Sequence, residues 1–239
     1  MRGGNLLVNA LAATTMVSLL SGCHWFFATP DTVADAAMAD ASVLDATAAD
    51  ADAPTDRIGC SDGTREGFAS LDAFPAIAGC EGGWSIAGMR TGPQCKLQSG
   101  NNGAQAAGLG CAAADLCAEG WHVCSLRSEL SLALGNGSCD GATQQPNAFF
   151  ATTLGSAPST SWVCDDLPTA TDDLYGCGTH GTVPPSPNPC APLTRGSGNA
   201  CSALDMHWRC PATQGTTEQT TVTKTAGPGG VLCCKLQLR

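Results

Sequence analysis

The sequence predicts a small α+β domain that is held together by disulfides and follows an exported N-terminal segment. Three observations favour this fold class: one amphipathic helix in the middle of the chain, several short apolar stretches between Gly- and Pro-rich turns, and 15 cysteines among 239 residues. Aromatic residues are few, with one Tyr, six Phe and five Trp, so we expect a modest core. Cross-links limit the freedom of the unfolded chain and are expected to supply part of the stability.

The helix is predicted over residues 125–134. Its apolar side chains recur at helical spacing and form one stripe: Leu126, Leu130, Ala133 and Leu134. Ser125 is expected to cap the first turn with its hydroxyl, and Gly135 is expected to end the helix, because glycine tolerates the left-handed conformation there.

Short strands are expected where apolar residues lie between turn residues. These stretches are 84–89, 147–154, 160–164 and 231–236. Residues 165–200 are almost all turn formers, and so long an irregular stretch is usually functional or mobile. Cys177, Cys190 and Cys201 indicate that this loop is tied down.

The first 22 residues are predicted to be an export signal. Arg2 precedes an apolar run over residues 6–20, which is too short and too polar for a membrane span. The run ends in Leu20-Ser21-Gly22-Cys23, which resembles the lipobox of bacterial lipoproteins. The resemblance implies cleavage before Cys23 and lipidation of Cys23, so that the membrane becomes a partner through the lipid. His24 stands where Asp would mark inner-membrane retention, which favours the outer membrane. The alternative to the lipobox interpretation is an ordinary signal peptide with an incidental cysteine.

Residues 23–59 are predicted to be a lipid-anchored, acidic tether that precedes a globular domain over residues 60–239. The stretch 24–59 holds seven Asp and one Arg, and no aromatic residue follows Phe27 within it. Such a composition cannot build a core, so we expect a disordered, solvated linker. The alternative is an Ala-rich helix.

Cysteine parity supports lipidation, because the total of 15 is odd and an unpaired thiol in an exported protein requires an explanation. Without Cys23, fourteen remain for seven disulfides, which fits an oxidising compartment: Cys60, Cys80, Cys95, Cys111, Cys117, Cys124, Cys139, Cys164, Cys177, Cys190, Cys201, Cys210, Cys233 and Cys234. Their connectivity cannot be deduced from the sequence. Cys233 and Cys234 are adjacent, so bonding them to each other would strain the geometry, and we expect two different partners for them.

The segment before the predicted helix carries a cysteine, a Gly-Trp pair, a hydrophobic residue and a serine at fixed spacing: Cys117, Gly120, Trp121, Val123 and Ser125. This pattern resembles the Cys-Pro-x-Gly-Trp-x-hydrophobic-Pro-[Ser/Thr] run that opens a helix in bacterial members of the C-type-lectin-like superfamily. The end of that fold is similar to the stretch 229–234, and Trp208-Arg209-Cys210 resembles its late aromatic strand. The resemblance implies a twisted, mostly antiparallel sheet with one or two helices and long loops. Cys124 replaces the usual Pro, and the Trp-Asn-Asp strand of calcium lectins is absent, so sugar binding is not implied.

The candidate ligand surface is the loop from Asp165 to Cys201 together with Trp208. Its carboxylates are Asp165, Asp166, Asp172 and Asp173. Hard oxygens that converge from a loop can bind calcium, which is the one cofactor we consider; the alternative is a solvated acidic loop.

Three functions remain in different classes. The first is a cell-envelope lipoprotein that displays a non-catalytic binding or adhesion domain for an envelope glycan or protein. The second is a structural envelope component without a small ligand. The third is a cysteine-dependent enzyme of the formylglycine-generating type. The sequence shows no Gly-x-Ser-x-Gly elbow, phosphate-binding loop or His-Glu-x-x-His motif, and its net charge of −10 argues against nucleic acid.

Overall fold

A computed structural model describes residues 58–135, 137–143, 145–155, 164, 173–183, 188–196, 201, 204–211 and 218–235. All of them fall within one compact unit, Thr47–Arg239. The predictions for residues 1–57, including Cys23, lie outside this part of the chain. Its elements are β1 (Ile77–Glu81), the 3₁₀ helix η1 (Ala113–Leu116), β2 (Trp121–Val123), α2 (Arg127–Ala133), β3 (Phe149–Ala151), β4 (Tyr175–Gly178), β5 (Thr194–Arg195), β6 (Trp208–Arg209), α3 (Glu218–Thr221), β7 (Thr223–Lys224) and β8 (Gly230–Lys235).

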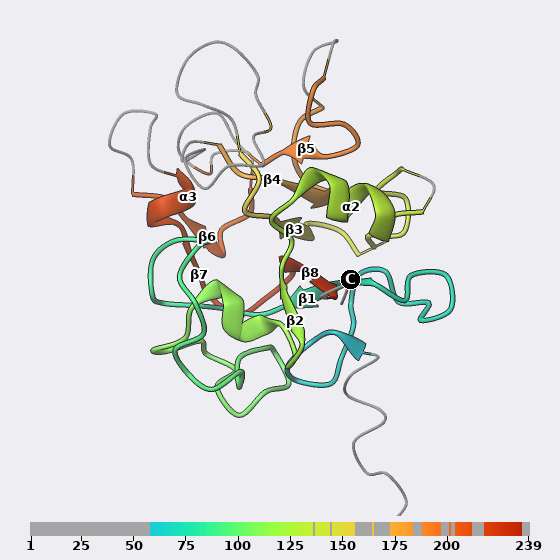
Figure 1. The fold of residues 1–239 in the computed structure, drawn as a ribbon. Coiled ribbons are helices and arrows are strands. Elements are labelled where there is room, and N and C mark those ends of the chain that lie inside the picture. The colour runs from blue at the N-terminus through green and yellow to red at the C-terminus, as the bar shows by residue number, and fades with distance from the viewer. Residues whose placement is uncertain are drawn as a thin grey trace, which may run out of the picture. The chain divides into compact units, whose positions relative to one another are not determined.

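The C-terminal strand β8 is the centre of the main sheet (Figure 1). On one side it pairs with β1 in antiparallel register from Ile77–Cys234 to Glu81–Gly230. Its other side is shared, because β2 pairs with residues 233–235 in antiparallel register and β3 pairs with residues 230–231 in parallel register. β4 and β5 extend the sheet beyond β3, and β6 and β7 form a separate pair. The described chain is therefore an α+β domain with a mostly antiparallel sheet, as predicted.

The main sheet is covered on both faces, and β8 contributes alternate side chains to two hydrophobic cores. Val231 and Cys233 belong to the core that contains Trp84, Trp121 and Trp208. Leu232 and Cys234 belong to the core that contains α2, Phe150 and Tyr175. Successive side chains of a strand point to opposite faces, so burial on both faces requires the continuous apolar run at residues 231–234.

Seven disulfides use all fourteen cysteines of the domain, which confirms its disulfide-rich character. The pairs are Cys60–Cys80, Cys95–Cys111, Cys117–Cys233, Cys124–Cys234, Cys139–Cys177, Cys164–Cys190 and Cys201–Cys210. The prediction that Cys233 and Cys234 have different partners is confirmed. Because the two cysteines point to opposite faces of β8, each bonds to the cysteine that its own face offers.

The central helix is shorter than predicted and begins differently. It spans Arg127–Ala133, and its N-cap is Leu126, so the prediction that Ser125 caps the helix is wrong. The Glu129 carboxylate performs the capping instead, because its Oε2 accepts the amides of Ser125 and Leu126 at 3.2 and 3.3 Å. The predicted end is confirmed: Gly135 has a φ of 60°.

Two strand predictions are confirmed in part, since β3 lies within 147–154 and β8 covers residues 231–235 of the predicted 231–236. The strand predicted at 84–89 is wrong, because its amides donate to three different segments: those of Trp84, Ile86 and Met89 bond to Lys224, Cys111 and Gln219. The stretch 160–164 lies outside the described residues except for Cys164.

The stretch predicted to be irregular, 165–200, contains two strands of the main sheet. β4 pairs with β3 and β5 pairs with β4, in spite of the many turn residues around them. β4 requires glycine at positions 176 and 178, because a Cβ there would come within 2.2 Å of the carbonyl oxygens of Phe150 and Ala148. No described helix is long and apolar enough to cross a membrane.

Candidate functional site

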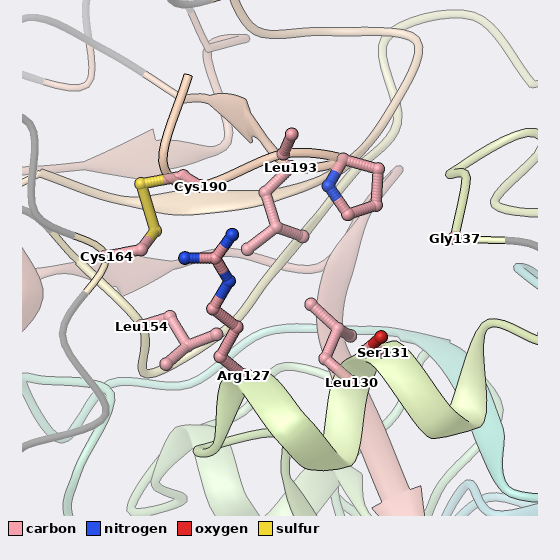
Figure 2. A pocket seen from close by; sticks show the side chains of 10 residues that line it. Arg127, Leu130, Ser131, Gly137, Leu154, Cys164, Cys190 and Leu193 are labelled. Carbon is pink, nitrogen blue, oxygen red and sulfur yellow. A yellow bond between two sulfur atoms is a disulfide. The ribbon is translucent and has the colours of Figure 1, made fainter. Parts of the chain in front are cut away.

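A cavity of about 200 Å³ lies between α2 and the segment that follows Cys190 (Figure 2). The apolar part of its wall includes Leu130, Leu154 and Leu193, which are at most 3% exposed. The disulfide Cys164–Cys190 forms another part of the wall. Ligand pockets are usually 300–1,000 Å³, so this cavity has room for one group of a larger ligand.

The segment over residues 188–193 is held in place by its own hydrogen bonds. Asn188 Oδ1 accepts the amide of Cys190 at 2.9 Å, and Asn188 Nδ2 donates to the carbonyl of Leu193 at 3.3 Å. The amide of Leu193 also donates to the carbonyl of Cys190 at 2.9 Å. Asn188 is not among the predicted site residues. The sequence feature that indicates its role is an Asn two residues before a cysteine, where its side chain can form an Asx-turn.

Two polar side chains of α2 stand at the cavity. Figure 2 shows Arg127 directed from the helix toward Cys190 and Leu193, with Ser131 one turn further along α2. Both residues are exposed, whereas Leu130 between them is buried. The cavity can accept an apolar group of a ligand, while the Arg127 guanidinium and the Ser131 hydroxyl contact polar atoms next to that group. In ligand sites a few polar groups of this kind fix the orientation of the ligand.

The entry of the chain into α2 is fixed by a contact between His122 and Glu129. His122 Nε2 lies 2.6 Å from Glu129 Oε1, while Glu129 Oε2 accepts the amides of Ser125 and Leu126. Burial would raise the pKa of Glu129, but the hydrogen bonds from His122 and the two amides outweigh it, so the pKa lies below its usual value. The carboxylate therefore stays ionised and holds the first turn of α2 in position beside the cavity.

Of the four predicted carboxylates, the structure describes Asp173, and its side chain lies inside the fold. Asp173 is 3% exposed, and its Oδ2 lies 2.6 Å from Arg195 Nη2. Asp173 is thus a buried ion-pair partner of Arg195 in β5. Asp165, Asp166 and Asp172 lie outside the described residues.

The predicted aromatic of the ligand surface is also internal. Trp208 is 4% exposed and packs edge-on against Trp84 and Phe149, with ring centroids 5.4 and 5.8 Å apart. Edge-to-face contacts of this kind add to the stability of a core. Of the predicted loop, the structure brings Cys190 to the cavity, and it places Trp208 in the core that contains Trp84.

Two groups of described residues have the ligand types and spacing for an ion: Cys95, Cys111 and Asp115, and Cys201, Cys210 and Glu218. The cysteines of both groups are disulfide-bonded, and the metal ligand is the thiolate. Asp115 is fully buried and accepts four backbone amides, those of Gln94, Cys95, Leu97 and Ala112.

No protein-family model matches the sequence, and no solved structure matches the fold.

Proposed function

We propose that this chain is a cell-envelope lipoprotein, anchored through lipidated Cys23, whose disulfide-rich domain is a non-catalytic binding module of C-type-lectin-like architecture. The observation that carries the binding role is the cavity beside α2. Its leucine side chains are buried, Arg127 and Ser131 of α2 stand at one side, and a disulfide forms part of its wall. Pre-ordering by a cross-link lowers the conformational entropy that is lost on binding.

The ligand class we propose is an envelope glycan or protein that inserts one small apolar group into the cavity. The volume of about 200 Å³ suits a single substituent. Arg127 and Ser131 would contact polar atoms next to that group. We propose a non-catalytic role because a cysteine-dependent reaction needs a thiolate, and all fourteen domain cysteines are in disulfides.

Two tryptophan substitutions on α2 test the cavity. Ser131 lines it, and Ser131→Trp would place an indole over its opening. Leu132→Trp is the matched control, because Leu132 is the next residue, is 68% exposed and does not line the cavity. The oxidised variants and the wild type are compared on a glycan array and in pull-downs from envelope extract, after circular dichroism has shown an unchanged fold.

We expect a shared ligand of the wild type and Leu132→Trp to be lost or weakened at least tenfold in Ser131→Trp, which corresponds to about 1.4 kcal/mol. Equal binding by all three proteins would place the contact surface elsewhere. If none of the three binds any component, the structural envelope component becomes the better account.

A further inference from the structure

The ammonium group of Lys224 is enclosed by backbone carbonyl groups. Lys224 ends β7 and is 2% exposed. Its Nζ donates to the carbonyl oxygens of Gly227 at 2.9 Å and of Gly82 and Thr225 at 3.2 Å each. A lysine ammonium has three N–H donors, so each has one acceptor and the buried group is fully satisfied.

Buried carboxylate and aromatic groups complete the surroundings of Nζ. Glu81 is 6% exposed, and its Oε2 accepts Asn101 Nδ2, which also donates to the Gly227 carbonyl, both at 3.3 Å. The ring of Trp208 lies 5.7 Å from Nζ, within the range of a cation–π contact. Burial lowers the pKa of Lys224 to about 8, against the opposite effect of Asp205 and Glu81, so the ammonium form predominates at pH 7.

The backbone is shaped to present these carbonyl groups. Gly227 has a φ of 135° and Gly82 a φ of 151°, which side chains rarely allow. At Gly227 a Cβ would lie 2.7 Å from the His207 ring, and at Gly82 it would lie 2.5 Å from Leu116. The carbonyl groups thus come from two glycine-dependent segments, 82–83 and 225–229. The buried Lys224 ammonium donates hydrogen bonds to both of them.

Carbonyl oxygens that converge on one point replace the hydration shell of a monovalent cation. We propose that these three carbonyl groups, with Glu81 and Trp208, form a binding site for a monovalent cation or a primary ammonium ion, and that Lys224 occupies it as a tethered ligand. The site would open to an external ion when the side chain is shortened. The proposal does not depend on the cavity beside α2.

The test is chemical rescue of Lys224→Ala. The substitution removes three carbons and the ammonium, so n-propylammonium supplies the missing atoms. The wild type, Lys224→Ala and Lys224→Met are refolded oxidatively and melted at pH 7 in n-propylammonium, potassium or choline chloride at equal ionic strength. Met fills the space of the lysine side chain without a charge and is the matched control. Choline is too large for the space between the three carbonyl groups.

We expect n-propylammonium, and more weakly potassium, to raise the melting temperature of Lys224→Ala alone. At about ten times the dissociation constant the rise should be roughly 3–6 °C. If Lys224→Ala fails to fold in choline chloride, the yield of folded, oxidised protein in n-propylammonium replaces the melting temperature. Folding is then measured by near-ultraviolet circular dichroism. The absence of rescue by either readout, or an equal rise in all three proteins, would overturn the proposal.

Intact-mass measurement of the wild type provides an independent test. A tethered ligand leaves the Lys224 amine intact. Once cleavage and lipidation at Cys23 are accounted for, the mass should therefore equal that of the chain with its disulfides formed. Loss of one further ammonia, with Lys224 joined to Asn101, would show a covalent cross-link and would overturn the proposal.

Discussion

Glu66 is a carboxyl group whose acid–base behaviour the fold changes. Its Oε2 accepts the amide of Glu81, the last residue of β1, at 2.9 Å. Burial raises the pKa of Glu66 to about 7, with a further contribution from the negative charges of Asp62 and Glu81, while hydrogen bonds from backbone amides act in the opposite direction. The side chain therefore takes up a proton near neutral pH in the folded protein and near pH 4.5 in the unfolded chain.

This difference predicts a pH dependence of stability. Between about pH 4.5 and 7 the folded state binds more protons at Glu66 than the unfolded state, so this contribution is fully present below pH 4.5 and is lost as the pH rises through 7. Glu66→Gln keeps an oxygen acceptor and removes the titration. We expect the melting temperature of the wild type to fall, relative to that of Glu66→Gln, between pH 5 and 8.

The control for this measurement is Glu119→Gln, at an exposed carboxylate. Its melting temperature should follow that of the wild type across the same pH range. Parallel curves for the wild type and Glu66→Gln would contradict the assignment.

At the scale of the element, β8 is held by hydrogen bonds on both edges and by a disulfide on each face. Cys117–Cys233 lies on the face of the core with Trp121, and Cys124–Cys234 lies on the face of the core with Leu130. The two bridges close nearly the same long loop, of 116 and 110 residues. Either bridge alone therefore keeps β8 close to β2 in the unfolded chain.

This redundancy predicts strongly non-additive disulfide removal. With Cys124–Cys234 intact, the bridge Cys117–Cys233 closes a ring of only about ten residues, so replacing Cys117 and Cys233 by Ala should cost about 2.5 kcal/mol. Replacing all four cysteines opens the long loop and should cost roughly 4–5 kcal/mol more. Guanidinium denaturation of the oxidised proteins measures both differences in the free energy of unfolding.

The pair Cys95–Cys111 is the control, because it closes its own loop of 16 residues. Its removal should cost about 3 kcal/mol and should add to the removal of Cys117–Cys233. Equal costs for the first and the second bridge of β8 would show that they act independently.

At the scale of the whole molecule, the sequence predicts that the domain is attached to a membrane through one residue. The lipobox-like stretch ends at Cys23, the one cysteine before the predicted globular domain. The remaining fourteen all find partners within the domain. This even number leaves Cys23 as the odd thiol, in agreement with lipidation as its predicted fate.

Lipidation is tested by Cys23→Ser in a bacterial host fed a labelled fatty acid. We expect the variant to accumulate as an uncleaved precursor without the label, because the acyl acceptor is gone. Ser21→Ala keeps a small residue before Gly22 and should be labelled and processed as the wild type is. Equal labelling of Cys23→Ser and the wild type would contradict the prediction.

The sequence by itself determined the local features whose signals are short-range. The helix follows from the spacing of Leu130, Ala133 and Leu134, and the terminal strand from the apolar run that begins at Val231. Adjacency alone excluded a bond between Cys233 and Cys234, because the geometry of a disulfide is local. Composition predicted a domain whose stability depends on cross-links.

Only the tertiary structure decided which distant residues meet. Partners such as Cys117 and Cys233 are 116 residues apart, and no periodicity records that distance. Asp173 looked like part of an acidic loop, but β4 and β5 bring Arg195 to it inside the fold. Lys224 lies in a polar stretch of the sequence, yet the carbonyl groups of Gly82 and Gly227 accept hydrogen bonds from its buried ammonium. Burial and charge pairing depend on long-range packing, so a residue's chemistry here is set by neighbours that the chain order does not reveal.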